Sequence, residues 1–496
     1  MMYGPRGSAN PGVRTGGLLQ SDLWAVESAV STVLGRFLTA LARRSEQFSL
    51  WALMLSLVAL PSWLGSSMST PLQGPGSLGW PDFRLYLSWA FPFVAPGLWL
   101  LSRCGRSNRR PFRWGPPFLT LPLAGLIALS IVQSPFALDA RSTVQLIAYQ
   151  VALFGFYLMA VNGHVPRAAI AGSLAAGMAI QWAIALPQAL LGHSLRLEAL
   201  GETTVDALRT GASVVVVGHQ RWLRAYGLAA HPNLLGGYLM VGMLVVAGYT
   251  LGRRGRVQIP LFLAEGLGLA ALLVTFSRSA WIGVALGCLV VVALTRGALN
   301  VKWRSLKGLA AVAMALGLLF IAAGWQLLVP RLSGAGDETE VRSIEERQLL
   351  NEAALSLIQR RPIPGVGLAN FSTAVLELVP ESPLGPPVQP VHNVPLLAAA
   401  ELGIPGGMLW LFTMVGPWIA LCMARKRICI TPWLAGLSGA LGALSVVAML
   451  DYYYWIIYPG SMMQWLLWGL WAREWQTATE AAPRIAPETS PRTSKG

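Results

Sequence analysis

The sequence predicts an all-α polytopic membrane protein. Charged residues make up only 12% of the chain and hydrophobic residues 54%, whereas about a quarter of a soluble protein is charged. The apolar residues lie in continuous runs that do not alternate with polar residues, which favours helices over barrel strands. The basic residues are concentrated in short segments between these runs, as in proteins that cross a bilayer many times.

We predict about twelve transmembrane helices, because crossing roughly 30 Å of hydrocarbon takes about 20 mostly apolar residues. They are expected near residues 48–66, 84–102, 116–134, 145–162, 168–190, 234–252, 259–275, 280–297, 308–328, 404–424, 433–450 and 458–472. The first 20 residues are rich in Gly, Pro and Arg and lack an apolar segment with a cleavage site, so no cleavable signal peptide is expected.

The distribution of cations predicts the orientation. With the N-terminus inside, most of the 37 Lys and Arg residues, including every Lys, fall on one side of the membrane. This side is cytoplasmic, because cytoplasmic loops retain basic residues. The net charge of +15 therefore reflects topology, and the basic loops are too short for a nucleic-acid-binding module. We expect a multi-pass protein of the cytoplasmic (inner) membrane with both termini in the cytoplasm.

The chain is expected to form one bundle with two long extracytoplasmic loops. A cytoplasmic N-terminal segment with an amphipathic helix over 21–45, the bundle and a disordered cytoplasmic tail are predicted at residues 1–47, 48–474 and 475–496. The extracytoplasmic loops span 191–233 and 329–403. A loop as long as the second usually carries function, and helix formers over 342–359 predict a short amphipathic helix within it.

Neither a disulfide framework nor a metal or cofactor site is expected. The cysteines lie in spans or on the cytoplasmic side, at Cys104, Cys288, Cys422 and Cys429. The five histidines are scattered and show no Cys/His spacing of the kind that holds zinc.

One imidazole lies where the second long loop re-enters the membrane, in the stretch VHNVPLLAAAELGIPGGML. His392 and Asn393 stand at the start of a helix-compatible run that ends in Gly403 and Gly406. His392 is either a hydrogen-bonded structural residue or a general base, a role that suits an ordinary pKa of about 6.5. His231, in the first long loop, is expected to cap or hydrogen-bond the start of the following span.

Four arginines on the outer side are candidate anion ligands. Arg221 and Arg224 are three residues apart, which predicts one helical face directly above the sixth span. Arg278 lies in the short turn TFSRSAW, and Arg347 lies beside two glutamates on the amphipathic helix. Guanidinium groups there either bind a diphosphate or anchor the protein to lipid headgroups.

These motifs resemble the signatures of the O-antigen ligase superfamily, which includes lipid A-core ligases, O-antigen polymerases and protein O-oligosaccharyltransferases. The stretch from His392 to Gly406 fits H-N-x9-G-x-x-G, and RAYGL, from Arg224 to Leu228, fits R-x3-L. The TFSRSAW turn and the segment ERQLLNEAALSLIQRRPIPGVGLANF are similar in order and topology, and the resemblance extends from about residue 118 to 471.

The resemblance implies a C-type glycosyltransferase-like bundle capped by the long loop. It implies metal-independent, inverting transfer of a glycan from a polyprenyl diphosphate carrier to a hydroxyl on a glycan, lipid or protein acceptor. By analogy His392 is the base, or orients the acceptor, and Asn393, Gly403 and Gly406 support it. The diphosphate ligands are Arg224 and Arg278, followed by Arg221 and Arg347.

A polytopic transporter or flippase of lipid-linked or small-molecule substrates is the alternative, since the same number and orientation of spans suits it. Transporters usually have matched halves with interrupted helices near the bilayer midplane. The sequence shows no such internal repeat, and its largest loop follows the ninth predicted span.

Overall fold

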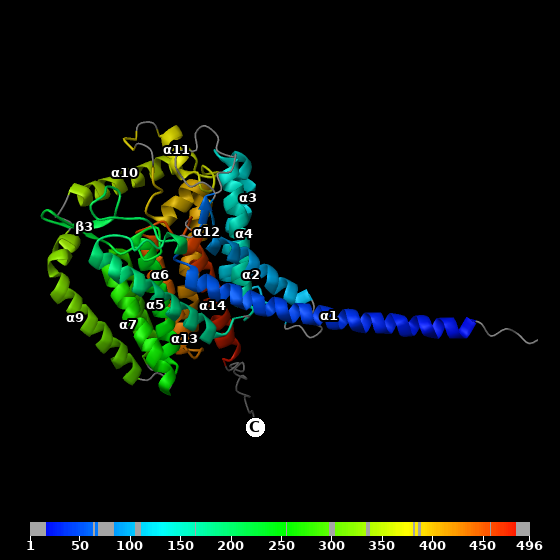
Figure 1. Cartoon of the computed structure of the whole chain (residues 1–496). Helices are drawn as coiled ribbons and strands as arrows, with labels where there is room; N and C mark the ends of the chain where they lie inside the picture. Colours follow the sequence, from blue (N-terminus) through cyan, green and yellow to red (C-terminus); the bar gives the residue numbers. More distant parts are fainter. Residues whose placement is uncertain are drawn as a thin grey trace, which may run out of the picture.

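The computed structural model describes residues 16–62, 65–67, 84–104, 111–163, 165–253, 255–296, 303–333, 338–379, 382–384, 388–456 and 458–482 (Figure 1). The helices are α1 (Gly16–Ala59), α2 (Leu87–Cys104), α3 (Pro117–Gln133), α4 (Ala140–Val161), α5 (Arg167–Leu191), α6 (Pro232–Leu251), α7 (Gln258–Val274), α8 (Arg278–Thr295), α9 (Trp303–Ser333), α10 (Glu338–Arg360), α11 (Phe371–Leu378), α12 (Val394–Ala424), α13 (Pro432–Ala448) and α14 (Tyr458–Glu480). Short 3₁₀ helices are η1 (Ser134–Phe136), η2 (Glu198–Leu200) and η3 (Gly255–Val257). Two antiparallel hairpins complete the fold, β1 (Gly65–Ser67) with β2 (Arg84–Tyr86) and β3 (Val214–Val217) with β4 (Gln220–Leu223).

The all-α polytopic prediction is confirmed. Every predicted span overlaps a helix, and seven helical segments within the described ranges are long and apolar enough to cross a membrane. These segments are Pro117–Phe136, Ala140–Val161, Arg167–Leu191, Pro232–Leu251, Gly255–Val274, Arg278–Thr295 and Val394–Ala424. Ala310–Ala322 and Pro432–Ala448 are apolar but shorter. A total of about twelve spans stays a prediction.

Several predicted boundaries are wrong. The expected surface helix and first span form one helix, α1, which projects from the bundle (Figure 1), because no Gly or Pro interrupts the chain between Gly35 and Pro61. Helix α14 continues to Glu480, so the start of the predicted disordered tail is helical. Residues 1–15 and 483–496 lie outside the described residues.

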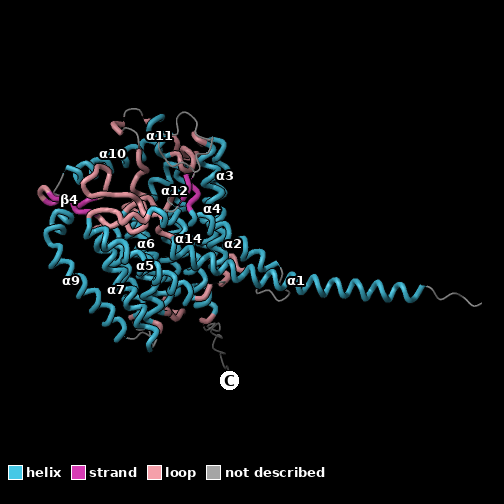
Figure 2. Tube along the Cα trace, viewed as in Figure 1, coloured by secondary structure: helices cyan, strands magenta, loops and turns pink. Residues whose placement is uncertain are grey.

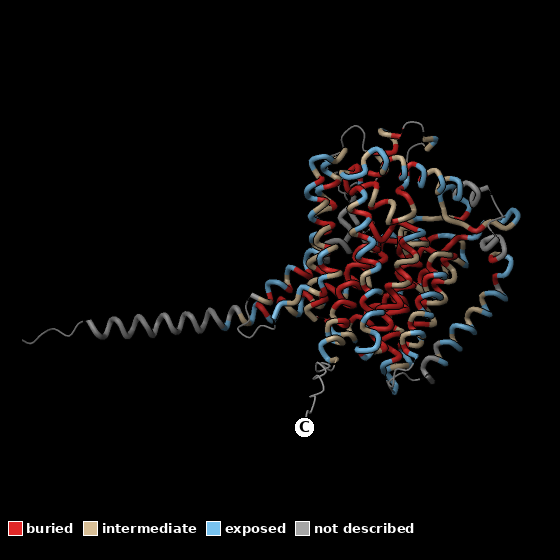
Figure 3. Tube along the Cα trace, turned by 180° about the vertical axis from the view of Figure 1, so that it is seen from behind, coloured by how far each residue is buried: buried red, intermediate tan, exposed pale blue. Residues whose placement is uncertain are grey.

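Helix α6 lies at the centre of the bundle, and nearly all of its residues are buried (Figure 3). It packs against α13, which packs against α8, through facing glycines. A Cβ atom at Gly248 would lie 2.7 Å from Cα of Gly436, and one at Gly439 would lie 2.7 Å from the carbonyl oxygen of Gly287. Small residues therefore allow these three backbones to approach closely, as at other membrane helix interfaces.

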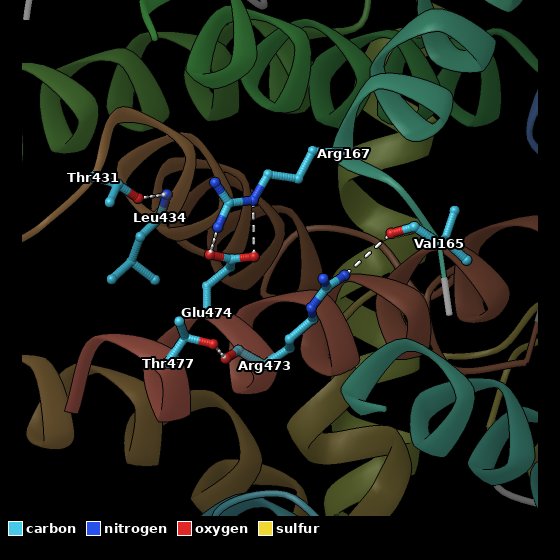
Figure 4. Close-up of polar contacts among 7 residues, drawn as sticks. All are labelled: Val165, Arg167, Thr431, Leu434, Arg473, Glu474 and Thr477. Carbon is cyan, nitrogen blue, oxygen red and sulfur yellow. Dashed lines mark hydrogen bonds and ion pairs between the residues drawn. The ribbon is translucent and has the colours of Figure 1, made fainter. Parts of the chain in front are cut away.

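Hydrogen bonds made by two arginines hold the C-terminal part of α14, and we call this group of contacts the polar clasp (Figure 4). Both guanidinium Nε and Nη2 of Arg167, at the start of α5, donate to the carboxylate of Glu474, which is 5% exposed. The neighbouring Arg473 donates to the carbonyl oxygen of Val165 at 3.1 Å. The clasp joins α14 to the segment before α5.

We expect Arg167→Leu to lower the free energy of unfolding by about 1–3 kcal/mol, because it leaves the buried Glu474 carboxylate without its charged partner. Arg113→Leu is the matched control, since it breaks the exposed Arg113–Glu480 pair and should cost less than about 1 kcal/mol. Thermal unfolding in detergent measures both. Equal shifts for the two variants would contradict the prediction.

The long loops gather at one end of the bundle (Figure 2). The β3–β4 hairpin, α10 and α11 lie there together with the N-terminal end of α12. The predicted helix over 342–359 is confirmed as part of α10. This end of the molecule carries the candidate site.

Candidate functional site

The glycines of the H-N-x9-G-x-x-G stretch break α12. Leu402 has a non-helical backbone conformation. Gly403 has a positive φ of +68°, which residues other than glycine rarely adopt. A Cβ atom at Gly403 would lie 2.1 Å from the carbonyl oxygen of Ile363. At Gly406 it would lie 2.3 Å from Cβ of Leu402. Both glycines therefore make room for the break. Helix α12 therefore contains both the helix-compatible run that follows His392 and the predicted span over 404–424.

The turn between α10 and α11 packs against this break and forms backbone hydrogen bonds with it. The amides of Val366 and Gly367 donate to the carbonyl oxygens of Ala400 and Glu401 at 3.0 and 2.9 Å. The amide of Ile404 donates to the carbonyl oxygen of Pro362 at 2.8 Å. The broken helix thus has its freed backbone groups paired within the protein, which is the condition for irregular backbone at membrane depth.

His392 lies directly before the start of α12. Asn393 caps the helix by accepting a hydrogen bond from the amide of Leu396 at 3.0 Å. Its amide nitrogen also donates to the carbonyl oxygen of Met449 at 3.5 Å. The half-buried His392 ring stands edge-to-face with Tyr452, with 5.0 Å between centroids. Its Nδ1 atom is buried and has no hydrogen-bond partner among the described residues.

A hydrogen-bonded chain leads from Arg224 to Asp451. The buried guanidinium of Arg224 donates through Nε to the carbonyl oxygen of Thr275 at 2.8 Å and through Nη2 to Oδ1 of Asn233 at 2.6 Å. The amide nitrogen of Asn233 donates to Oδ2 of Asp451 at 2.9 Å. Arg224 therefore ties the start of α6 to the α7–α8 turn and to residues 451–455, which we call the aromatic turn.

Arg347, on α10, brings a second cation to this cluster. Its charge acts on both His392 and Asp451. Burial, and secondly Arg347, lower the pKa of His392 from 6.5 to about 3. Burial raises the pKa of Asp451, while the hydrogen bond from Asn233 and the charges of Arg347 and Arg224 oppose the rise. The structure thus brings two predicted arginines near one carboxyl group, and the predicted histidine packs on Tyr452, the residue next to it.

Arg278 is the first residue of α8 and is half-buried. It follows by three residues the Thr275 carbonyl group that accepts a hydrogen bond from Arg224. The start of α6 packs closely on this turn, because a Cβ atom at Gly236 would lie 2.9 Å from Cβ of Ser277. Arg278 therefore belongs to the turn that borders the Arg224–Asp451 chain.

The prediction that Arg221 and Arg224 share a helical face is wrong. Val214–Val217 pairs with Gln220–Leu223 as an antiparallel hairpin, so Arg221 is a strand residue opposite Val216. It is exposed, and its guanidinium donates to the carbonyl oxygens of Ala207 and Arg209 at 2.7 and 3.4 Å. Arg221 holds its own loop, whereas Arg224 is buried.

This cluster also contains three residues that were not predicted from the sequence: Asn233, Asp451 and Tyr452. The available signal was the run DYYYW at residues 451–455, an acidic residue followed by four aromatic residues between the last two predicted spans. The prediction for His231 is confirmed, since it caps α6 and its Nδ1 accepts a hydrogen bond from the amide of Asn233 at 3.2 Å.

An apolar cavity lies beside the aromatic turn. Its volume is ≈ 20 Å³, which is enough for about one water molecule. It is lined by Leu234, Gly237, Tyr453, Tyr454, Gly460 and Met463, among others. Leu234 follows Asn233 directly, so the cavity adjoins the hydrogen-bonded chain.

The lowered pKa of His392 predicts two pH effects. The free protein keeps His392 neutral down to acidic pH, so kcat/KM for a reaction that uses it should show no fall from its ionisation between about pH 8 and about pH 5. The unfolded chain takes up this proton near 6.5 and the folded chain only near 3, so acidification through that window removes stability. Rate and unfolding measurements on wild type and His392→Gln test both effects. A wild-type acid limb near pH 6.5 that vanishes in the variant would contradict the first.

Residues 263–411 match the family model described as O-antigen ligase. The matched segment contains Arg278, Arg347 and His392, as well as the glycines that break α12. Comparison with curated proteins found no match. The match confirms that the chain resembles the O-antigen ligase superfamily, as its sequence motifs indicate.

Proposed function

We propose that the protein transfers a glycan from a polyprenyl diphosphate carrier to a hydroxyl acceptor on the extracytoplasmic face of the cytoplasmic (inner) membrane, with both termini in the cytoplasm. The observation that supports this most is that Arg224 and Arg347 act on Asp451, whose neighbour Tyr452 packs on His392, at the loop-bearing end of the bundle. The family match supports the class of reaction.

The arginines are proposed to stabilise the negative charge that develops in this reaction. The leaving group is a diphosphate, and its charge must be stabilised as the bond to the sugar breaks. Arg278 and Arg347 are half-buried and are the proposed ligands of the phosphate oxygens. Arg224 is held by Thr275 and Asn233 and supplies a fixed positive charge behind them. Arg221 is not proposed as a ligand, because it is bound within its own loop.

His392 is the proposed general base. The acceptor oxygen attacks the anomeric carbon, the bond from that carbon to the diphosphate oxygen breaks, and the diphosphate keeps the electron pair. The acceptor proton passes to the imidazole, and attack opposite the leaving group inverts the anomeric centre. In the free protein Arg347 opposes protonation of His392. A bound diphosphate beside Arg347 would offset that charge and strengthen the base.

The reaction is proposed to need no metal ion. Among the described residues no group of three His, Cys, Asp or Glu side chains is placed to hold one, and the arginines supply the positive charge.

The test is transfer by purified protein in detergent. The substrates are a polyprenyl diphosphate-linked oligosaccharide and, in separate reactions, a lipid, a glycan and a Ser/Thr peptide acceptor. We expect transfer to one acceptor class, unchanged by EDTA, with inverted anomeric configuration by NMR. Movement of the donor across proteoliposomes without transfer to any acceptor would overturn the proposal. Mass spectrometry of glycoconjugates from a deletion strain identifies the natural acceptor, as uncapped lipid, shortened chains or unmodified protein.

A further inference from the structure

Glu401 is a buried acidic residue whose carboxylate joins two separate loops to α12. It is 1% exposed and lies directly before the break in the helix. Its Oε2 accepts a hydrogen bond from the indole nitrogen of Trp455 at 2.8 Å, and its Oε1 accepts one from the amide of Phe371 at 3.4 Å. The first bond reaches the aromatic turn, and the second reaches the start of α11.

Trp455 is connected by hydrogen bonds to Tyr452, which packs on His392, and through Tyr452 to Asp451. Its amide donates to the carbonyl oxygen of Tyr452 at 2.9 Å, and the amide of Tyr452 donates to Oδ1 of Asp451 at 2.9 Å. The aromatic turn is therefore one hydrogen-bonded unit. A displacement of Trp455 would move Tyr452, which packs on His392, and Asp451, which holds Asn233.

Two side-chain bonds connect the first segment of α12 to this part of the chain. One is the bond from Asn393 to the carbonyl oxygen of Met449, whose 3.5 Å length is at the limit for a hydrogen bond. The other is the 2.8 Å bond from Trp455 to Glu401. The shorter and fully buried bond should dominate, because its loss leaves a polar atom unpaired in the interior.

We propose that Glu401 is a positioning residue that fixes the aromatic turn against α12, so that Tyr452 and Asp451 keep their positions relative to His392. This inference rests on the proposed function, because the position of the aromatic turn affects catalysis only if His392 acts on a substrate. Glu401 touches neither donor nor acceptor in this scheme. Its effect passes through Trp455.

The test compares Trp455→Phe, Glu401→Gln and the double variant with wild type. Trp468→Phe is the matched control, because Trp468 is a buried tryptophan whose indole nitrogen has no hydrogen-bond partner in the described structure. Trp455→Phe and Glu401→Gln should each lower kcat, by up to about 10²-fold, since misplacement of a reacting group by about 1 Å can cost that much. The donor KM should stay nearly constant. The double variant should be no slower than the slower single variant, and Trp468→Phe should resemble wild type.

A second readout does not depend on activity. Diethyl pyrocarbonate acylates accessible imidazoles, and peptide mass spectrometry gives the rate at His392 alone. Loss of the Trp455–Glu401 bond should raise this rate about tenfold, as expected for one lost hydrogen bond that had kept Tyr452 over the ring. Trp468→Phe should not raise it.

The outcomes separate the two proposals. If wild type transfers no glycan to any acceptor, the proposed function fails. The acylation rates still decide whether Glu401 fixes the position of the aromatic turn relative to His392. If Trp455→Phe matches Trp468→Phe in both kcat and acylation rate, the positioning role is wrong. Should Glu401→Gln fail to fold, as judged by size-exclusion chromatography, Trp455→Phe alone decides the question.

Discussion

Replacing His392 with Ala should lower the rate of glycan transfer by about 10²–10⁴-fold, the usual contribution of a general base. Among the described residues, His231 is the other imidazole beside the cluster, and both of its ring nitrogens are already hydrogen-bonded, Nδ1 to the amide of Asn233 and Nε2 to the hydroxyl of Ser213. Donor binding should be nearly unchanged, since the arginines remain. Single-turnover rates and donor binding measured on the same preparation separate the two effects.

His219→Ala is the matched control for this substitution. His219 is exposed at the tip of the β3–β4 hairpin, so the same chemical change is made away from the cluster. Its rate should equal that of wild type. If His392→Ala also transferred glycan at the wild-type rate, His392 would be a structural residue and the proposed base would have to be sought elsewhere.

The helices were predictable because each apolar run must satisfy its backbone internally, and the run itself reveals the helix. Helix ends were harder to predict. The helical run that follows His392 and the span over 404–424 were both predicted, but their union in α12, across a break filled by the α10–α11 turn, was not. That filling is a contact between distant parts of the chain, which a local pattern does not contain.

The candidate site was predictable in part for a related reason. His392 stands out as a lone imidazole at a membrane boundary and Arg347 as a cation on the helix of the long loop, and in the structure the charge of Arg347 acts on His392. Asp451 and Asn233 did not stand out, because their importance comes from pairing with Arg224 across the bundle. Arg221 was wrongly grouped with Arg224, since spacing alone cannot distinguish a helix from a strand followed by a turn.

Arg278→Ala should lower the rate of transfer by about 10²–10³-fold, comparable with the loss of one group that stabilises charge in a transition state. The physical reason is that the diphosphate gains charge as it leaves, and Arg278 begins α8 at the turn that borders the Arg224–Asp451 chain. Arg278→Lys should recover part of the rate, because lysine keeps the charge but loses the fork of donors. Transfer assays at saturating acceptor measure kcat and the donor KM for each variant.

Arg221→Ala separates a specific phosphate contact from general positive charge. It removes the same charge from the loop-bearing end of the bundle, but from an exposed strand residue that is bound to loop carbonyl groups. Its kcat should stay near the wild-type value while that of Arg278→Ala falls. Equal losses in the two variants would mean that the outer arginines act only through the overall field, and Arg278 would then not be a diphosphate ligand.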